Sequence, residues 1–418
     1  MSKFVIQGGR SLSGEILVSG SKNAVLPLIA ACLLTDRECV LHNVPLIKDV
    51  DVMLSIIEDL GAQITRQGST IKIHAQDIKK SEPNPELVGK FRGSILLVGA
   101  LLGRLGKVKL PYPGGDRIGK RPIDTHVSAL ELLGATANVD DSLDFSAEKL
   151  IGNKIVLEET SVTATENAML AAVTAEGKTI IKLAAMEPHV QQLGEFLNLM
   201  GAKIQGIGTT TLNIEGVKKL QGAEITVIPD SEEAASLITL AAAAKGDVVV
   251  KNANPDFLED FLLRLKKMNV NLETGPDFVH VMPPTQEYIG TKIQCGFYPK
   301  LNSDYVPPMS VLATQAQGET LMYEWLYENR LGYVNELVKM GANAEILDPH
   351  RVRIIGPTKL HAQNITTYDL RMGITLVIAA LIAEGQSEIS DIHHVDRGYT
   401  DLEGRLNKLG ADIRRVEE

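Results

Sequence analysis

The chain has 418 residues, and single hydrophobic cores usually stop growing at roughly 250–300 residues, so we expect two domains. Its 42 Lys and Arg against 52 Asp and Glu give a formal net charge of −10, which argues against a broad surface for nucleic acid or for an anionic membrane. Hydrophobic residues make up 44% of the chain and charged residues 22%, which excludes a disordered or fibrous protein.

The most apolar stretches, residues 24–34 and 374–382, are too short to span a bilayer, and no signal peptide is recognised, so we expect a cytoplasmic protein. Cys32, Cys39 and Cys295 have neither disulfide-framework nor metal-ligand spacing, and they are expected to fill the core. No cluster of carboxylates or histidines has ligand spacing, so neither a metal nor a cofactor is expected.

One helix ending recurs six times along the chain. Its middle residues lie 67 to 73 positions apart, close to one sixth of the chain. Gly, and Asn in the fourth copy, tolerate the left-handed conformation in which such helices end. The copies are Leu60-Gly61-Ala62, Leu133-Gly134-Ala135, Met200-Gly201-Ala202, Met268-Asn269-Val270, Met340-Gly341-Ala342 and Leu409-Gly410-Ala411.

A helix rich in small residues precedes each of these endings. In chain order these helices are expected over residues 23–34, 93–102, 164–176, 231–245, 306–317 and 371–384. Each is apolar on nearly every face and is therefore predicted to be buried. Short strands follow most of them, as at 177–181 and 246–250, and alternating segments such as 63–66 and 70–73 follow the endings. The predicted unit is β-α-β-α-β-β.

A linear stack of such units would leave the apolar helices exposed, whereas three units can bury three helices together. We therefore predict an α/β protein of two domains with three units each, divided near Pro229-Asp230. Ligands of such proteins usually bind between the halves, so the active site is expected in the cleft between the domains.

Charged loops precede several helices. Ser21-Lys22-Asn23 indicates either an anion site at a helix start or an ordinary cap with a solvated lysine. Residues 112–124 combine three glycines, two prolines and three cations, which indicates a shaped loop that can close over an anion. Residues 368–371 and 394–399 each hold an Asp/Arg pair at an expected helix start, which by itself indicates a helix-terminal ion pair.

Cations recur in these loops although the protein is acidic, which predicts a site for a ligand with several negative charges. They are Lys22, Arg92, Arg121, Arg330, Arg371 and Arg397. Neither GxGxxG after a strand nor GxxxxGK[ST] is present, so dinucleotide-binding and P-loop functions have little support.

Motifs along nearly the whole chain resemble those of one family. They are Gly20-Ser21-Lys22-Asn23-Ala24 with Leu26-Pro27, Asn43-Val44-Pro45 with Lys48-Asp49-Val50, Phe91-Arg92-Gly93-Ser94, Pro113-Gly114-Gly115 with Ile118-Gly119 and Arg121-Pro122, Glu328-Asn329-Arg330, Asp369-Leu370-Arg371, and Asp396-Arg397-Gly398-Tyr399. With them the chain resembles the UDP-N-acetylglucosamine 1-carboxyvinyltransferases of the enolpyruvyl transferase superfamily.

The resemblance implies two inside-out α/β domains, each of three βαβαββ units, over residues 22–229 and over 1–21 with 230–418. It also implies transfer of the enolpyruvyl group of phosphoenolpyruvate to the 3-hydroxyl of UDP-N-acetylglucosamine, with release of phosphate, as the first committed step of peptidoglycan synthesis. No cofactor, nucleic acid or membrane partner is implied.

The resemblance also assigns residue roles. It places Asp116 where the family usually has a cysteine proton donor, makes Asp304 the base and makes Lys22 and Arg397 catalytic cations. Phosphoenolpyruvate is expected to contact Lys22, Asn23, Arg121, Arg371 and Arg397. The nucleotide sugar is expected to contact Asn23, Arg92, Arg121, Pro122, Ile123, Asp124, Thr125, Ser161, Val162, Asp304 and Leu326. Supporting positions are Lys48, Glu187, Asp230, Arg330 and Asp369.

The chain departs from the family pattern near the expected diphosphate. The family usually reads Ser-Val-Gly-Ala-Thr, and this chain has Thr163 in place of the glycine. Glu159 stands where the family frequently has a lysine. After Asp230 the usual Arg-Ile-Glu-Ala-Gly-Thr is replaced by residues 231–236, Ser-Glu-Glu-Ala-Ala-Ser. These changes leave open transfer to another hydroxyl acceptor, such as a different nucleotide, or a non-catalytic descendant that binds nucleotide sugars. Because Asp116 replaces a thiolate, fosfomycin is expected not to inactivate the protein.

Overall fold

The structure is a computed structural model, and it describes residues 2–115 and 121–417. These residues form two compact units. The first unit comprises residues 20–115 and 121–228, and the second unit comprises residues 2–19 and 229–417.

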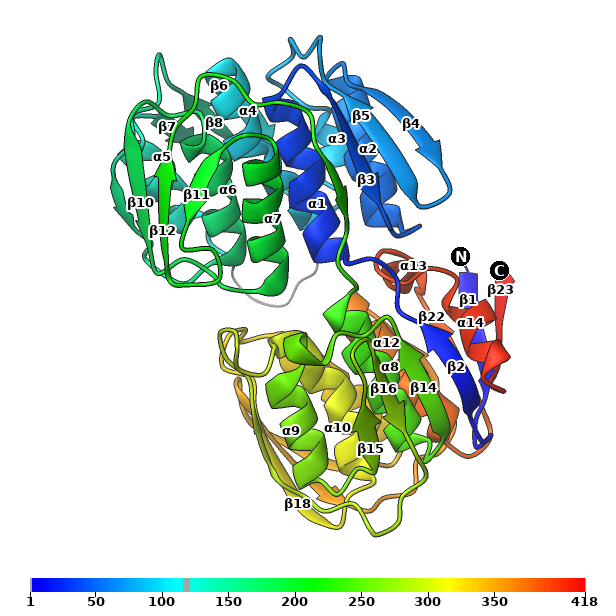
Figure 1. Cartoon of the computed structure of the whole chain (residues 1–418). Coiled ribbons are helices and arrows are strands. Elements are labelled where there is room, and N and C mark those ends of the chain that lie inside the picture. The colour runs from blue at the N-terminus through cyan, green and yellow to red at the C-terminus, as the bar shows by residue number, and fades with distance from the viewer. Residues whose placement is uncertain (1, 116–120, 418) are drawn as a thin grey trace. The chain divides into compact units, whose positions relative to one another are not determined.

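The first unit has apolar helices at its centre and small sheets outside them (Figure 1). Its helices are α1 (Lys22–Ala31), α2 (Lys48–Asp59), α3 (Pro85–Val88), α4 (Leu97–Leu105), α5 (Asp124–Leu132), α6 (Val162–Ala172) and α7 (Pro188–Leu199). Its strands are β3 (Glu38–His42), β4 (Gln63–Gln67), β5 (Thr70–His74), β6 (Lys107–Pro111), β7 (Thr136–Val139), β8 (Ser142–Ser146), β9 (Lys154–Val156), β10 (Lys178–Lys182), β11 (Lys203–Gln205), β12 (Thr211–Glu215) and β13 (Glu224–Thr226). They pair in the orders β13-β3-β5-β4, β6-β8-β7 and β11-β12-β10-β9.

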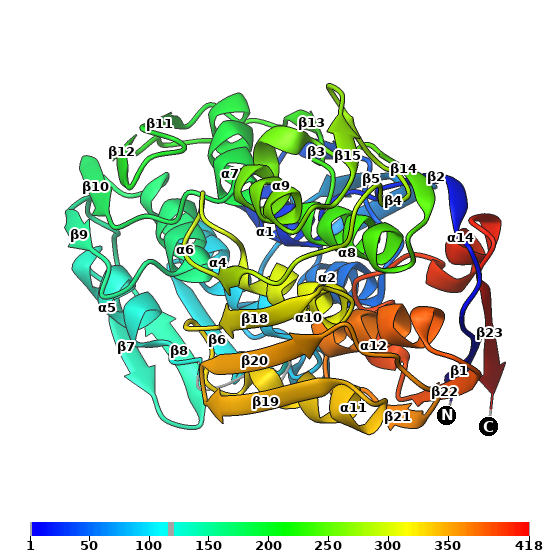
Figure 2. The ribbon, with the colours of Figure 1, turned by 90° about the horizontal axis from the view of Figure 1, so that it is seen from below.

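The second unit repeats this arrangement. Its helices are α8 (Ser231–Ala243), α9 (Glu259–Lys267), α10 (Val306–Thr314), α11 (Tyr333–Lys339), α12 (Leu370–Ile382), α13 (His393–Asp396) and α14 (Leu402–Lys408). Its strands are β1 (Ser2–Gln7), β2 (Ser13–Leu17), β14 (Asp247–Lys251), β15 (Leu272–Thr274), β16 (Phe278–Val281), β17 (Lys292–Gln294), β18 (Gly318–Tyr323), β19 (Asn343–Asp348), β20 (Arg351–Gly356), β21 (Asn364–Thr366), β22 (Gln386–Ser390) and β23 (Asp412–Glu417). The sheet orders are β15-β16-β14-β2, β17-β18-β20-β19 and β21-β22-β1-β23, and Figure 2 shows β18, β20 and β19 side by side.

Short 3-10 helices extend or precede several elements of both units. They cover Cys32–Leu34, Arg92–Leu96, Pro255–Phe257, Ser303–Tyr305 and Arg330–Gly332.

The six helices predicted to be buried form the two cores. They are α1, α4 and α6 in the first unit and α8, α10 and α12 in the second. Every residue of α10 is buried, as are residues 370–381 of α12. Because such helices have no face for solvent, sheets and outer helices must cover them on all sides. The predicted α/β class with apolar helices inside the sheets is confirmed.

The six predicted helix endings all have a positive φ, as the sequence predicts. They close α2, α5, α7, α9, α11 and α14. The φ angles are +112° at Gly61, +94° at Gly134, +98° at Gly201, +65° at Asn269, +102° at Gly341 and +99° at Gly410.

One repeat differs from the predicted strand pattern. Five sheets have four strands, of which one short strand runs parallel to its neighbour, whereas the described residues of the second repeat form the three-stranded sheet β6-β8-β7. On the side of β6 away from β8, the described residues make one backbone hydrogen bond to the strand, in which the Lys109 N–H donates to the Ser81 carbonyl over 2.9 Å. A glycine and proline-rich approach to α3 and α4 therefore replaces the expected strand.

The N-terminal strands belong to the second unit. β1 pairs antiparallel with both β22 and β23, and β2 pairs parallel with β14. Residues 2–17 thus complete two sheets whose other strands lie more than 200 positions later in the chain.

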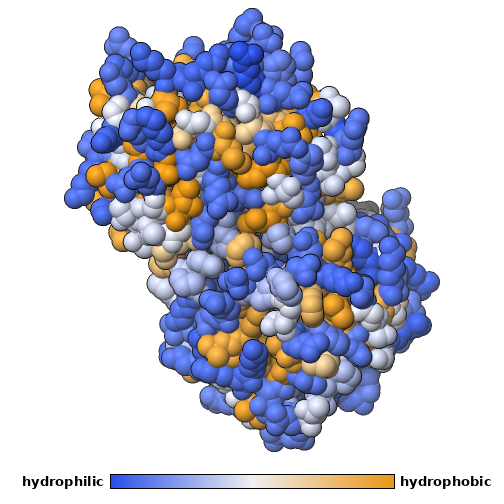
Figure 3. Space-filling view, in the orientation of Figure 1, coloured by the Kyte–Doolittle hydropathy of each residue, from blue (hydrophilic) through white to orange (hydrophobic). Residues whose placement is uncertain are grey.

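All three cysteines are buried and free, as predicted for core residues. The face seen in Figure 3 mixes apolar with hydrophilic residues, as folded proteins commonly do. No helix within residues 2–115 and 121–417 combines the length and the apolar character needed to cross a membrane.

Candidate active site

Asp304 is held by two arginine side chains in the second unit. Arg330 Nη2 donates to Asp304 Oδ1 over 2.5 Å, and Arg371 Nε donates to Asp304 Oδ2 over 2.7 Å. The side chains of Arg330 and Arg371 are only 4% and 8% exposed, while that of Asp304 is 22% exposed. Both carboxylate oxygens are therefore engaged in charge-assisted hydrogen bonds, and the carboxylate lies at the more accessible side of the cluster.

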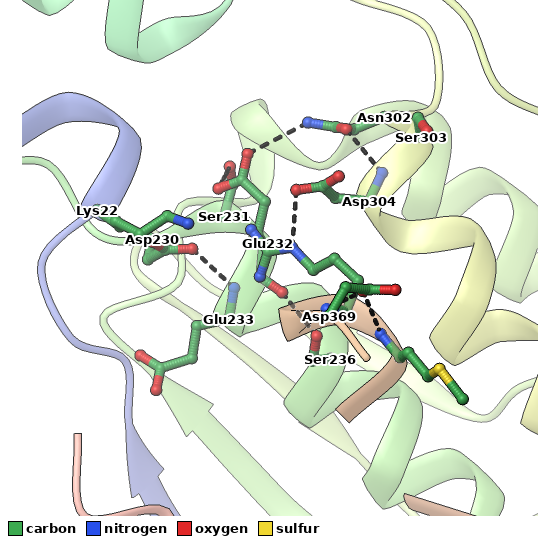
Figure 4. A network of polar contacts seen from close by, with 12 residues as sticks. Lys22, Asp230, Ser231, Glu232, Glu233, Ser236, Asn302, Ser303, Asp304 and Asp369 are labelled. Carbon is green, nitrogen blue, oxygen red and sulfur yellow. Dashed lines mark hydrogen bonds and ion pairs between the residues drawn. The ribbon is translucent and has the colours of Figure 1, made fainter. Parts of the chain in front are cut away.

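Backbone and side-chain contacts fix the loop that carries Asp304. Asn302 caps the short helix of residues 303–305 by accepting from the Asp304 N–H over 2.9 Å, and its amide donates to Glu232 over 3.2 Å (Figure 4). Ser303 accepts from Arg330 Nη1 over 2.9 Å and donates to Glu324 over 2.5 Å. The two ends of the Arg330 guanidinium thus bind neighbouring residues, which orients its plane.

Glu324 is a buried acid beside this cluster. Its carboxylate accepts from Ser303 and from the Leu326 N–H. Burial raises the pKa of Glu324, although Arg330 and these hydrogen bonds act in the opposite direction. The contact with Leu326 ties the backbone expected to bind the nucleotide sugar to the same network.

Asp369 positions the first turn of α12. Its Oδ1 accepts from the backbone N–H groups of Arg371 and Met372, both over 2.8 Å (Figure 4). The sequence predicts an ion pair between Asp369 and Arg371, but the Arg371 Nε donates to Asp304 instead. The helix cap orders the backbone, and it leaves the long Arg371 side chain to reach Asp304.

The start of α8 lies against α12 through a second polar group. Asp230 caps α8 by accepting from the Glu233 N–H over 2.8 Å. Ser236 Oγ lies 3.0 Å from the hydroxyl of Tyr399, and Arg371 Nη1 donates to that hydroxyl over 3.4 Å. Burial raises the pKa of Tyr399 to about 12, so the phenol stays neutral and can accept from the guanidinium.

The second predicted Asp/Arg pair is arranged differently from the expectation. α13 ends at Asp396 rather than beginning there, and the Asp396 carboxylate accepts from Arg415 over 2.7 and 3.0 Å. Arg397 follows at the C-cap and is half-buried.

In the first unit Lys22 begins α1. Ser21, rather than Asn23, caps this helix by accepting from the Ala24 N–H over 3.2 Å. Lys22 Nζ lies 3.7 Å from Asp49 Oδ2, and the two side chains are 14% and 5% exposed. Of the two alternatives for this tripeptide, the solvated lysine is wrong, because a buried carboxylate in the first turn of α2 holds the ammonium group.

Arg92 and Arg121 come together in the same unit. Arg92 Nη2 donates to the Arg121 carbonyl over 2.7 Å. In the first part of the loop of residues 112–124, a Cβ on Gly114 would lie 1.8 Å from the Gly89 backbone oxygen, and Gly115 has a φ of +119°. This part of the loop requires glycine, as expected for a shaped loop. Asp116 lies outside the described residues.

A buried histidine connects the residues after Arg121 to α6. His126 Nε2 lies 3.1 Å from Thr163 Oγ1, and Nδ1 lies 3.1 Å from Asn167 Nδ2. Burial, followed by the nearby Arg92 charge, lowers the pKa of His126 to about 3, so the ring is neutral. Ser161 caps α6 by accepting from the Ala164 N–H over 3.4 Å.

Two acids lie close together in the chain's first unit, Glu166 buried within α6 and Glu187 half-buried at the N-cap of α7. Glu166 and Glu187 each have one buried carboxylate oxygen without a hydrogen-bond partner among the described residues. Burial and then the charge of Glu187 raise the pKa of Glu166 well above its usual range.

The other predicted positions differ in exposure. Lys48, Pro122, Asp124 and Glu159 are exposed, Asn23, Val162 and Leu326 are half-buried, and Ile123 and Thr125 are buried. Reasoning from the sequence missed four contributors, namely Ser303, Glu324, Tyr399 and His126. His126 directly follows the predicted residues 121–125, and Glu324 directly follows β18 within an apolar run, so position along the chain offered a signal for both.

The chemistry available in the second unit is that of a carboxylate base with two guanidinium groups. Guanidinium groups bind carboxylates and phosphates through parallel hydrogen bonds. An anionic ligand that takes over these donors would leave Asp304 free to accept a proton.

The sequence profile of the EPSP synthase (3-phosphoshikimate 1-carboxyvinyltransferase) family matches residues 6–406. The chain belongs to this family. The chain is 41% identical to the UDP-N-acetylglucosamine 1-carboxyvinyltransferase of Borreliella burgdorferi, over 100% of both chains. It is 42% identical to the protein of the same name from Bradyrhizobium diazoefficiens, over 100% of this chain and 98% of the relative.

Solved structures of enolpyruvyl transferases are similar to this chain over nearly its whole length. The enolpyruvyl transferase NikO from Streptomyces tendae superposes with a TM-score of 0.90 at 26% identity, covering 99% of each chain. EPSP synthase from Acinetobacter baumannii superposes with a TM-score of 0.77 at 19% identity over 100% of each chain, which shows the shared fold.

Proposed function

We propose that the chain is a UDP-N-acetylglucosamine 1-carboxyvinyltransferase. It transfers the enolpyruvyl group of phosphoenolpyruvate to the 3-hydroxyl of UDP-N-acetylglucosamine and releases phosphate, the first committed step of peptidoglycan synthesis. The observation that carries this proposal is the Asp304 carboxylate between Arg330 and Arg371, which supplies a base beside donors for an anionic substrate. The name shared by relatives about 40% identical along the whole chain supports the acceptor.

In the proposed reaction the sugar 3-oxygen adds to C2 of phosphoenolpyruvate while a proton is added to C3. Asp304 takes the proton from the hydroxyl, and Asp116 gives the proton to C3. The product of this step is a tetrahedral ketal. C3 then loses a proton, the bond between C2 and the phosphate oxygen breaks, and the enol ether and phosphate leave.

Cations are needed because the substrate carries a carboxylate and a phosphate whose charge redistributes in this addition. Arg371 with Arg330 suits the carboxylate, because their donors already bind a carboxylate within the protein. The resemblance assigns Lys22, Arg121 and Arg397 to the phosphate and the carboxylate of phosphoenolpyruvate. Arg92, residues 121–125, Ser161, Val162 and Leu326 are assigned to the nucleotide sugar.

The two hydrogen bonds that Asp304 accepts explain why it needs a substrate to act as a base. A carboxylate that accepts two charge-assisted hydrogen bonds is a weak proton acceptor. When the phosphoenolpyruvate carboxylate draws Arg330 and Arg371 away, Asp304 regains its basicity beside the sugar hydroxyl. Binding of one substrate thereby activates the base for the other. A cytoplasmic location stays a prediction.

Phosphate release from phosphoenolpyruvate tests this function. The acceptors are UDP-N-acetylglucosamine, UMP and shikimate 3-phosphate, each with the wild type and with Asp116→Ala. Release that requires UDP-N-acetylglucosamine and is lost in Asp116→Ala supports both the acceptor and the acid. Release with another acceptor alone would contradict the proposed acceptor, and no release with any acceptor would contradict enolpyruvyl transfer.

A further inference from the structure

The hydrogen bonds of Asn167 fix the orientation of its amide. The Gly99 N–H donates to Asn167 Oδ1 over 2.6 Å, so this atom is the oxygen. Asn167 Nδ2 donates to the Ile95 carbonyl over 3.1 Å, so that atom is the nitrogen. The side chain is fully buried, and flipping the amide would place N–H against N–H and oxygen against oxygen.

The orientation of Asn167 determines which nitrogen of His126 carries the proton. Asn167 Nδ2 is a donor and lies 3.1 Å from His126 Nδ1, so Nδ1 must accept. The neutral ring then carries its single proton on Nε2. Nε2 lies 3.1 Å from Thr163 Oγ1 and therefore donates to it.

Thr163 Oγ1 consequently accepts a hydrogen bond from His126, and its own hydrogen remains to be donated. Its only hydrogen-bond partner among the described residues is His126. Thr165, two residues later, differs because its hydroxyl donates to the Ser161 carbonyl and accepts from the Ala185 N–H. Thr163 is half-buried, so the residue is not enclosed by the protein on all sides.

We propose that Thr163 is a specificity-determining residue whose hydroxyl donates a hydrogen bond to a diphosphate oxygen of the nucleotide sugar, with His126 and Asn167 as positioning residues. The proposal rests on the proposed function, because it concerns the acceptor of that reaction. It gives a role to a residue at which the chain departs from the glycine of the family pattern.

The surroundings favour an anionic oxygen as the acceptor of this hydrogen bond. Arg92 lies close enough to His126 for its charge to act on the ring, so the region holds a cation. Thr163 lies directly after Ser161 and Val162, the positions assigned to the nucleotide sugar by the resemblance. The hydroxyl hydrogen can be donated to an oxyanion while the oxygen keeps the hydrogen bond from His126.

The test measures binding by isothermal titration calorimetry with UDP, UMP and uridine as probes. Thr163→Val keeps the shape of the side chain and removes the donor, and Thr163→Ser keeps the donor. Because a hydrogen bond to a charged group is lost, we expect Thr163→Val to raise the Kd of UDP about 10- to 100-fold, with little change for uridine. Thr163→Ser should stay within about threefold of the wild type.

Thr174→Val is the matched control. It removes a threonine hydroxyl that bonds to the Gly103 and Ala171 carbonyls of the same unit, and it should leave the Kd of UDP unchanged. His126→Phe tests the positioning role, since it should weaken UDP binding in the Thr163 background and have no further effect in the Thr163→Val background. Melting temperatures of all variants separate loss of folding from loss of binding.

An unchanged Kd of UDP in folded Thr163→Val would overturn the inference, as would an equal loss for UDP and uridine. Phosphate release by the wild type distinguishes the two proposals. If the wild type turns over UDP-N-acetylglucosamine and Thr163→Val binds UDP with an unchanged Kd, the proposed function stands and the role of Thr163 is overturned. A wild type that binds neither UDP nor UMP would overturn both.

Discussion

Replacing Asp304 by asparagine should weaken catalysis and strengthen the binding of phosphoenolpyruvate at the same time. The substitution keeps the size of the side chain and removes its charge. The new amide would offer one oxygen in place of the two that now accept from Arg330 and Arg371. At least one buried guanidinium therefore loses its anionic partner and becomes available to the carboxylate of the substrate.

The magnitudes follow from the burial of the two arginines, which are 4% and 8% exposed. Removing one partner of a buried ion pair typically costs about 3–5 kcal/mol, so the melting temperature should fall by several degrees. A hydrogen bond to a charged group contributes about 1.5–3 kcal/mol, so ending this internal competition should lower the Kd of phosphoenolpyruvate about tenfold or more. Loss of the base should lower kcat by about 10²–10⁴.

Calorimetric titration with phosphoenolpyruvate and a phosphate-release assay measure the two effects separately. Asp348→Asn is the control, because it breaks an ion pair with Arg351 on the surface of the same unit. That variant should change neither the Kd of phosphoenolpyruvate nor kcat. A folded Asp304→Asn protein that binds phosphoenolpyruvate as the wild type does, or more weakly, would refute the account of competing carboxylates.

Three further predictions concern the acid, the buried histidine and the helix endings. Fosfomycin should cause no time-dependent inactivation of the wild type, whereas Asp116→Cys should stay active and become sensitive; a dead and insensitive variant would remove Asp116 from the mechanism. The pKa of His126 is lowered to about 3, so its contribution to stability is present above pH 6.5 and is lost as the pH falls toward 3, at up to about 1.4 kcal/mol per pH unit. His126→Gln should flatten the fall in unfolding free energy between pH 7 and 4 measured with urea, and an unchanged slope would contradict a buried neutral ring. Gly61→Ala should lower the free energy of unfolding more than Gly201→Ala does. Both substitutions have the cost of a positive φ, about 1–2 kcal/mol, but only the new Cβ at 61 meets a neighbour, the Asp77 oxygen at 2.9 Å. Equal losses of stability would argue against the clash at 61.

The repeat architecture was predictable because the same physical constraint acts six times. Each unit needs a residue that tolerates a positive φ at the end of its outer helix, and this residue is glycine at 61 and asparagine at 269. The apolar helices were equally visible, since α12 is buried along nearly its whole length and its sequence has no polar face. The missing strand beside β6 was not predictable, because a single hydrogen bond at Ser81 depends on packing that no local pattern records.

The charged residues of the site could be selected from the sequence, but their partners could not. Asp369 and Arg371 are neighbours in the chain, and an ion pair between them was the natural expectation. The cap geometry of α12 instead turns Asp369 toward the backbone and leaves Arg371 to Asp304, 67 positions away. Such pairing over long sequence separations is decided by the fold.

Neutral polar residues were harder to predict than charged ones. The sequence does not show how the hydroxyls of Thr163 and Thr165 are bonded, yet one accepts a hydrogen bond from His126 and the other is saturated by backbone groups. The role of Thr163 depends on a tautomer that is fixed by Asn167, and this residue lies on the adjoining turn of the same buried helix.

The central claim is that the chain makes an enolpyruvyl ether of UDP-N-acetylglucosamine. Mass spectrometry and NMR of the product formed from phosphoenolpyruvate and UDP-N-acetylglucosamine, with phosphate measured in the same reaction, test it most directly. The account predicts an enolpyruvyl group on the sugar 3-oxygen and one phosphate for each ether formed. Phosphate without the ether, or recovery of both substrates unchanged, would contradict it.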